Sequence, residues 1–199
     1  MPWKSTSALA ALLLAALLLA ASVTVHAADF DQNKATAESR KIAQEFMQKL
    51  GGTLKQQLQS GAPEAAIATC KQVAPALAAE YSTAGRVVKR VSLKPRNQAL
   101  GTPDDWEKRM LESFDHSLSD GNPISGMEIS RVTEDASGRW FRYLKAIPTL
   151  PMCLQCHGST ERIPDGVKAI LAKDYPGDQA TGYSAGAVRG AVSIKLKLD

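Results

Sequence analysis

The sequence lacks several features that would assign it to a broad class of proteins. It has no cluster of basic residues with interleaved aromatic residues, and its formal net charge is only +4, so we do not expect a nucleic-acid partner. After residue 27, no stretch is long and apolar enough to cross a bilayer. No internal repeat and no low-complexity linker divides the chain. These absences favour one domain of ordinary size with a hydrophobic core.

The first 27 residues have the pattern of a secretory signal peptide. Lys4 precedes an apolar run at residues 8–21, and Val25 and Ala27 occupy the −3 and −1 positions of a cleavage site. The alternative is an uncleaved membrane anchor, but the run is shorter than the ~20 residues that a spanning helix needs. We therefore expect export to the periplasm, no stable membrane span after cleavage, and a single domain over residues 28–199.

Two of the three cysteines lie in the sequence Cys-Leu-Gln-Cys-His at residues 153–157. The pattern C-x-x-C-H is the attachment signature of a c-type haem. The two thiols form thioether bonds with the two vinyl groups of the porphyrin, and the adjacent histidine ligates the iron. The motif predicts one haem c attached through Cys153 and Cys156, with His157 as the proximal ligand.

Three other interpretations of this motif stay open, namely a redox-active dithiol, half of a zinc site and a plain disulfide. Pro151 and Gly158 bracket the motif as a loop, whereas a thioredoxin-like dithiol lies between a strand and a helix. A zinc site needs more ligands, and the chain has no second C-x-x-C and no H-x-x-H. Haem c is attached after export, so the predicted signal peptide favours haem.

The second axial ligand is not fixed by the motif. Cys70 lies on the apolar face of a predicted helix, and a cysteine thiolate binds iron. Buried unpaired cysteines also act simply as small hydrophobic residues. The other candidates are His116, Met110, Met127, Met152 and solvent. After residue 27 only two histidines are present, and one is already assigned, so we do not expect a haem enzyme with acid–base groups.

Hydrophobic periodicity predicts helices followed by a mostly antiparallel sheet with inserted helices, which is an α+β class. The helices are expected over residues 32–58, 61–82, 102–118 and 163–176. The strands are expected over residues 85–93, within 126–148 around a turn at 135–138, and over 188–198. The third helix is expected to have Thr102 as its N-cap and Pro103 at its first position.

Three stretches together resemble a known family of exported single-haem c-type proteins of unassigned physiological role. They are VSLKPRNQALGTPDDWE (91–107), CLQCHG (153–158) and YPGDQATGYSAGAVRGAVSI (175–194). The resemblance covers residues 36–198 and implies a PAS-like haem domain with histidine and cysteine as axial ligands. It therefore implies that Cys70 is the distal ligand. The chain departs from the family pattern in the 91–107 loop, where Gln98 stands in place of the usual proline.

Two arginines also belong to these stretches. Arg96 suits a haem propionate, because its planar guanidinium matches a carboxylate, but it also suits a pairing with Glu107 that would hold the loop. Arg189 precedes Gly190 at the start of a strand, which indicates a structural role.

Axial ligation by Cys70 and His157 would close the iron to substrates and stabilise its ferric form. This arrangement suits redox or ligand sensing, with electron transfer to an oxidoreductase as the alternative and a small haem enzyme as the least favoured. The chain carries no kinase or cyclase segment, so a signal would pass to a separate, unidentified periplasmic protein.

Overall fold

The computed structural model describes residues 30–60 and 63–199. The predicted signal peptide lies outside the described residues. Within the described ranges, none of the helices combines the length and the apolar character that a membrane span requires. Residues Asp31–Asp199 form one compact unit.

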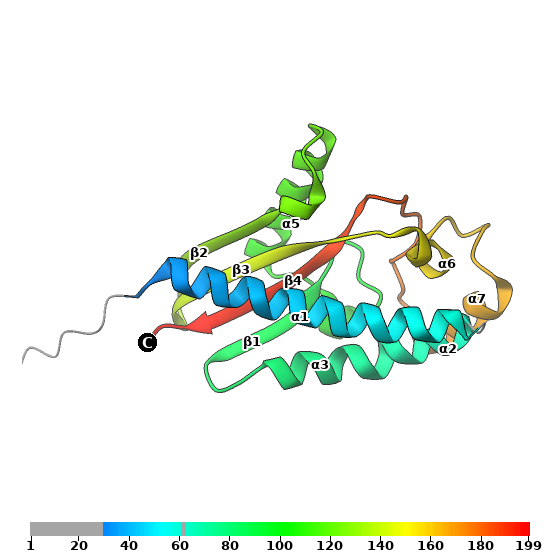
Figure 1. The fold of residues 1–199 in the computed structure, drawn as a ribbon, viewed down its shortest axis with the longest axis horizontal. Helices are drawn as coiled ribbons and strands as arrows, with labels where there is room; N and C mark the ends of the chain where they lie inside the picture. Colours follow the sequence, from blue (N-terminus) through cyan, green and yellow to red (C-terminus); the bar gives the residue numbers. More distant parts are fainter. Residues whose placement is uncertain (1–29, 61–62) are drawn as a thin grey trace, which may run out of the picture. The chain divides into compact units, whose positions relative to one another are not determined.

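Helices come first in this unit and a four-stranded sheet follows, which confirms the predicted α+β class (Figure 1). The strands are β1 (Arg86–Val91), β2 (Glu128–Asp135), β3 (Gly138–Pro148) and β4 (Val188–Lys197). Their order across the sheet is β1-β4-β3-β2, and every neighbouring pair is antiparallel. The predicted hairpin within 126–148 is confirmed, because Asp135 pairs with Gly138 at its tip.

The main helices are α1 (Gln32–Gln59), α2 (Pro63–Ala68), α3 (Ala74–Tyr81), α5 (Asp105–Ser119) and α7 (Asp165–Asp174). Two short helices, α4 (Gln98–Gly101) and α6 (Leu154–His157), lie in stretches that the sequence indicates only as loops. In α4, the Asn97 side chain accepts a hydrogen bond from the Leu100 backbone N–H, so a residue that indicates a turn here begins a helix.

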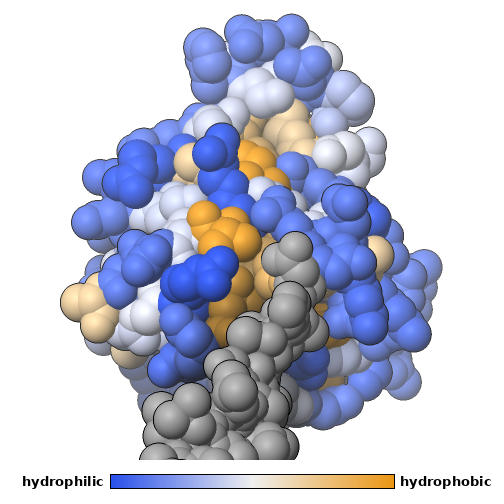
Figure 2. Space-filling model, turned by 90° about the vertical axis from the view of Figure 1, so that its left-hand side faces the viewer, coloured by the Kyte–Doolittle hydropathy of each residue, from blue (hydrophilic) through white to orange (hydrophobic). Residues whose placement is uncertain are grey.

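The two faces of the sheet are covered by different helices. Val91, Leu144 and Ala191 point to one face, where they pack against Trp106 and Phe114 of α5. Helices α1 and α3 contact the other face, and in Figure 1 they run side by side along the sheet. Figure 2 shows one narrow hydrophobic strip between mostly hydrophilic residues on the end of the molecule that it presents.

The N-terminus of α5 differs from the sequence-based expectation. Asp104, not Thr102, is the N-cap, and it forms a capping box with Glu107 in which each side chain accepts a hydrogen bond from the other's backbone N–H. The box satisfies two N–H groups at the helix start, whereas a Thr102 cap would satisfy one. Thr102 instead donates to the Gln98 carbonyl at the end of α4. The predicted Thr102 cap is therefore wrong.

Glu107 anchors α5 to the sheet through a buried charge network. Its side chain is 1% exposed and lies 2.9 Å from the Lys89 ammonium, while Ser193 donates to it at 2.7 Å. Arg142 lies 3.5 Å from the same carboxylate and also pairs with Asp104. The network therefore joins α5 to β1, β3 and β4.

Replacing Glu107 by alanine should lower the free energy of unfolding by about 3–5 kcal/mol, because the buried guanidinium of Arg142 loses a carboxylate partner. Glu112→Ala is the control, since Glu112 is an exposed acid on the same helix. Guanidinium chloride unfolding of the two variants measures the difference. Equal stability of the two variants would contradict the anchoring role.

Glu128 on β2 should make the stability of the fold depend on pH. Arg40 of α1 and the Tyr143 hydroxyl donate to its carboxylate, and these bonds hold the pKa of Glu128 below its ordinary value of 4.5. A lowered folded-state pKa gives stability that is present above pH 4.5 and is lost as the pH falls through the folded pKa. The stability deficit of Glu128→Gln relative to the wild type should therefore be largest at pH 7 and should shrink as the pH falls below 4.5. Thermal unfolding between these pH values measures this, and a constant difference would refute it.

Candidate functional site

A cavity with two adjoining lobes lies beside the sheet. We call the first the strand lobe; it has a volume of about 410 Å³ and lies between α3, β1 and the 95–102 loop. We call the second the helix lobe; it has a volume of about 430 Å³ and lies between α1, α2 and the 150–157 segment. Six residues line both lobes, namely Cys70, Arg90, Arg96, Ile147, His157 and Arg189. Each volume falls within the range of ~300–1,000 Å³ that is usual for ligand pockets.

The helix lobe has an apolar wall. Leu50, Leu54 and Leu58 of α1 line it together with Phe46 and Ile67. The three leucines are only half-buried, although they continue the apolar stripe that predicts α1. Their side chains face the cavity and do not pack fully against other side chains, which explains why they are half-buried. Their four-residue spacing keeps them on the same face of α1. The stripe therefore marks the wall of a binding cavity as well as a packing face.

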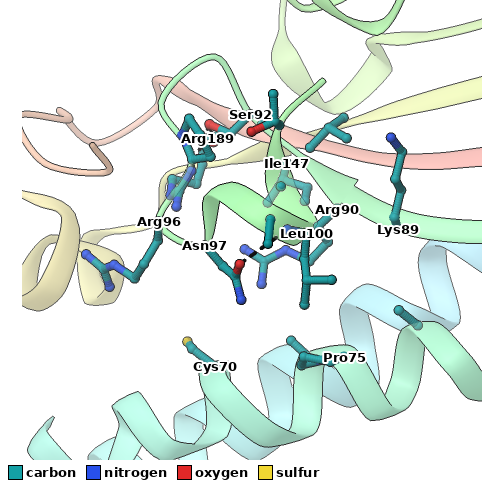
Figure 3. Close-up of a pocket in the computed structure, with 18 of the residues that line it drawn as sticks. Cys70, Pro75, Lys89, Arg90, Ser92, Arg96, Asn97, Leu100, Ile147 and Arg189 are labelled. Atoms are coloured by element: carbon teal, nitrogen blue, oxygen red, sulfur yellow. Dashed lines mark hydrogen bonds between the residues drawn. The ribbon is translucent and has the colours of Figure 1, made fainter. Parts of the chain in front are cut away.

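The strand lobe contains most of the polar side chains of the cavity. Ser92, Asn97 and Thr102 line it, together with Arg90 and Arg189. In the close-up, the Arg189 side chain reaches toward the centre of the cavity, while Cys70 points up from the helices below it (Figure 3). The helix lobe is thus the more apolar of the two, and the three arginines line the boundary between the lobes together with Cys70 and His157.

The C-x-x-C-H motif is held in a short helical segment. A 3₁₀ turn at Pro151–Cys153 leads directly into α6, so Cys153 and Cys156 lie about one turn apart and both line the helix lobe. A Cβ at Gly158 would lie 2.6 Å from the Leu154 carbonyl oxygen, so the residue after the histidine must be small for the chain to leave the helix this way. Burial raises the pKa of the Cys156 thiol. All three cysteines of the chain are free thiols, so the disulfide interpretation of the motif has no support here.

His157 presents one ring nitrogen to the cavity. Its Nδ1 lies 2.7 Å from the Ala180 carbonyl oxygen, which can only accept, so Nδ1 carries the proton. The lone pair is therefore on Nε2, the tautomer in which a histidine binds a metal. Burial, together with the cationic Arg189 and Arg96, holds the pKa of His157 well below 6.5. The imidazole is thus neutral.

Arg96 stabilises the orientation of His157 through hydrogen bonds to neighbouring segments. Its guanidinium pairs with Asp178 at 3.0 Å and donates to the Cys156 carbonyl. Asp178 in turn accepts from the Ala180 N–H at 2.8 Å, and Ala180 is the residue whose carbonyl orients His157. The predicted pairing of Arg96 with Glu107 is wrong, because Glu107 is bound to Lys89, Arg142 and Ser193 beneath α5. The predicted contact of Arg96 with a propionate stays a prediction.

Cys70 lies in a break of the helix, which the hydrophobic periodicity did not indicate. Residues Thr69–Val73 form a π-helical segment between α2 and α3, with the Ala74 N–H bonded to the Thr69 carbonyl. Pro75 explains the break, because it has no N–H and its ring would clash with the Lys71 carbonyl of a regular helix. Such π-bulges often occur at functional sites. Pro75 within an otherwise helical pattern was the signal that could have revealed it.

The sequence indicates a structural role for Arg189. A β-bulge instead places its side chain in the cavity. Ile147 pairs with Gly190 but Pro148 pairs with Val188, so Arg189 is the extra residue of β4. Gly190 has a φ of +151°, and a Cβ there would lie 2.3 Å from the Val91 carbonyl oxygen. Regular alternation would place Arg189 with Ala191 on the α5 face, whereas the bulge turns it into the cavity. Its Nε lies 3.5 Å from His157 Nε2.

The structure separates the alternative ligand candidates. The His116 side chain is 81% exposed and pairs with Asp120 at the end of α5. Met110 and Met127 pack in the hydrophobic core beneath α5. Met152 lines the helix lobe, so among these alternatives it alone shares the cavity with Cys70 and His157.

Comparison with known proteins identifies relatives of this fold. In the search of solved structures, the chain is similar to the crystal structure of the cyanobacterial heme-protein Tll0287, with 22% sequence identity and a TM-score of 0.55. The similarity covers 83% of this chain and 93% of that one. At this sequence identity it shows that the two proteins share a fold. No curated protein sequence matches the chain. The family model described as Tll0287-like matches residues 28–197, so the chain belongs to the Tll0287-like family.

Proposed function

We propose that this protein binds one haem c, attached covalently through Cys153 and Cys156, with His157 as proximal ligand and Cys70 as distal ligand. One observation carries the proposal: the C-x-x-C-H motif and the only other cysteine, 83 residues before it, line the same cavity. The family assignment and the similar fold of a protein described as a heme-protein support it. The proposal includes export, a periplasmic location and a single PAS-like haem domain after the signal peptide.

The residues of the cavity fit such a group. The two thiols of the motif line the apolar lobe, which suits the vinyl edge of a porphyrin and its ring. His157 has its lone pair on Nε2, where Arg189 Nε donates a 3.5 Å hydrogen bond that an iron atom would replace. Cys70 offers the sulfur of a side chain from a different element. The Nε atom of Arg90, which lines both lobes, is buried and has no hydrogen-bond partner among the described residues. A cationic group in need of an acceptor fits a ligand that carries carboxylates.

When bound, the haem would supply an iron centre that exchanges one electron. The chain keeps the two ligand side chains in different settings. His157 is fixed through Ala180, Asp178 and Arg96, all bonded to one another. Cys70 lies on a π-helical segment that lacks regular helix hydrogen bonds and is half-buried. This difference favours a change at Cys70 when the charge of the iron changes.

The proposed role is therefore redox or ligand sensing. A Cys70 thiolate would stabilise ferric iron more than ferrous iron, so reduction would favour release of Cys70. Helices α2 and α3 flank this segment and contact α7 and β1, which gives a path from the ligand to the surface. The signal would pass to a separate partner protein. Retention of the Cys70 bond after reduction would favour electron transfer instead.

Covalent attachment predicts a specific mass. The exported protein, produced in cells with working cytochrome c maturation, should carry the mass of residues 28–199 plus one haem. Cys153→Ser and Cys156→Ser should each lose a thioether bond, and the double variant should carry no covalent haem. Cys70→Ser is the matched control and should keep the full haem mass. Intact-protein mass spectrometry decides, and an unmodified wild-type chain would refute haem c.

Distal ligation by Cys70 predicts a spectroscopic change. The ferric wild type should give the low-spin electron-spin-resonance signal of a thiolate–histidine haem, and Cys70→Ser should abolish it. Met152→Leu is the control, because Met152 lines the same lobe. If reduction releases the thiolate, the ferrous wild type and the ferrous Cys70→Ser variant should have similar absorption spectra. An unchanged ferric signal in Cys70→Ser would exclude this ligand.

A further inference from the structure

Two arginines of the cavity lack an anionic partner. Arg90 and Arg189 line both lobes, and neither guanidinium lies within 4.0 Å of a carboxylate of the described residues. Arg96, the third arginine of the cavity, is already paired with Asp178. Lys89 also lines the strand lobe, but its ammonium is bound to Glu107. The described cavity wall therefore carries two cations that form no ion pair, and the aromatic ring of Tyr183, with its centroid 5.2 Å from the Arg189 guanidinium, compensates the charge of Arg189 only in part.

The buried Nε of Arg90 destabilises the fold unless a ligand accepts its hydrogen bond. Three buried side-chain nitrogen or oxygen atoms in the described chain lack a hydrogen-bond partner, and Arg90 Nε is the one whose residue lines the cavity. Arg90 shares a face of β1 with Val88, so strand alternation directs it away from α5. A buried donor left unsatisfied destabilises a protein unless something else binds it.

Arg189 is directed into the cavity by a distortion of the backbone. The bulge at Gly190 turns its side chain away from the α5 face, and only 7% of the residue is exposed. Its hydrogen bonds go to neutral groups: Ser92 Oγ at 3.0 Å, the Lys94 carbonyl at 3.5 Å and His157 Nε2 at 3.5 Å. A buried charge without a countercharge is rare in proteins because desolvation disfavours it. Its presence here indicates an anionic ligand.

We propose that Arg90 and Arg189 form a carboxylate-binding pair that holds the two haem propionates. This inference rests on the proposed function. On a haem, the vinyl and propionate groups lie on opposite edges of the ring. Attachment at Cys153 and Cys156 would keep the vinyl edge in the helix lobe, so the propionate edge would lie toward the strand lobe. The guanidinium groups of Arg90 and Arg189, which line both lobes, match two carboxylates in number, charge and hydrogen-bonding geometry.

The pair is tested first on the haem-loaded protein. Arg90→Gln and Arg189→Gln should each shift the midpoint potential to a lower value, and the double variant should shift it further, because a nearby cation disfavours the more positive ferric iron. Arg86→Gln is the matched control: Arg86 is on the same strand, bonds to the Tyr81 carbonyl and does not line either lobe. It should leave the potential unchanged. Equal potentials in all the proteins would overturn the inference.

A second measurement asks whether the porphyrin carboxylates are the groups bound. The full chain with Cys153→Ser and Cys156→Ser is titrated with haemin and with haemin dimethyl ester, which lacks the two charges. The background chain should bind haemin more tightly than the ester. Adding Arg90→Gln or Arg189→Gln should weaken haemin binding by about tenfold and leave ester binding unchanged. Equal weakening of both compounds would overturn the inference, since it would indicate a structural role.

The remaining source of a carboxylate is a small diffusible anion. Replacing chloride by acetate at constant ionic strength should leave the midpoint potential of the loaded wild type unchanged, because the propionates already occupy the arginines. A saturable shift that Arg90→Gln abolishes would assign the pair to a free carboxylate and overturn propionate binding. Absence of covalent haem in the mass measurement would instead refute the proposed function, so the two failures are distinguishable.

Discussion

The buried ion pair between Arg96 and Asp178 is the interaction on which the candidate site depends. Both side chains are about nine-tenths buried, at 7% and 11% exposed, and each makes a second bond to the backbone. Arg96 binds the carbonyl of Cys156, and Asp178 binds the N–H of Ala180. The pair thereby ties three segments that are far apart in sequence: the loop after β1, the C-x-x-C-H motif and the segment before β4. The orientation of His157 follows from it, because Ala180 accepts the imidazole proton.

Two irregularities of the backbone then direct the remaining side chains into the cavity. Pro75 breaks the helix at Thr69–Val73, and Cys70 lies in that break. Gly190 permits the bulge of β4, which moves Arg189 from the α5 face to the cavity. Each irregularity costs regular backbone hydrogen bonds or packing. Both occur where the cavity is lined, which is the pattern expected when function, and not stability, selects a local structure.

Two groups of charged residues next to the sheet differ in whether the protein itself compensates them. Beneath α5, Glu107 is surrounded by Lys89, Arg142 and Ser193, so that network is compensated and stabilises the fold. On the cavity side, Arg90 and Arg189 have no such countercharge within the described residues. One group of buried charges therefore completes the protein's own structure, while the other is arranged for a ligand. This division separates residues of the fold from residues of the site.

The sequence by itself determined the helix-then-sheet order, the strand positions and the motif at 153–157, because these depend on local periodicity and on spacing along the chain. It also identified Cys70 and Arg96 as site candidates, although Arg96 could not be matched to Asp178 from spacing alone. It misplaced the α5 cap at Thr102, because Thr102 and Asp104 both precede an acidic residue by three positions and only the fold decided between them.

No local sequence pattern indicated that Arg90 and Arg189 line the cavity. Strand register and a bulge set their direction, and these depend on how β1, β3 and β4 pair, so only the tertiary structure brought the arginines into the cavity beside Cys70 and His157.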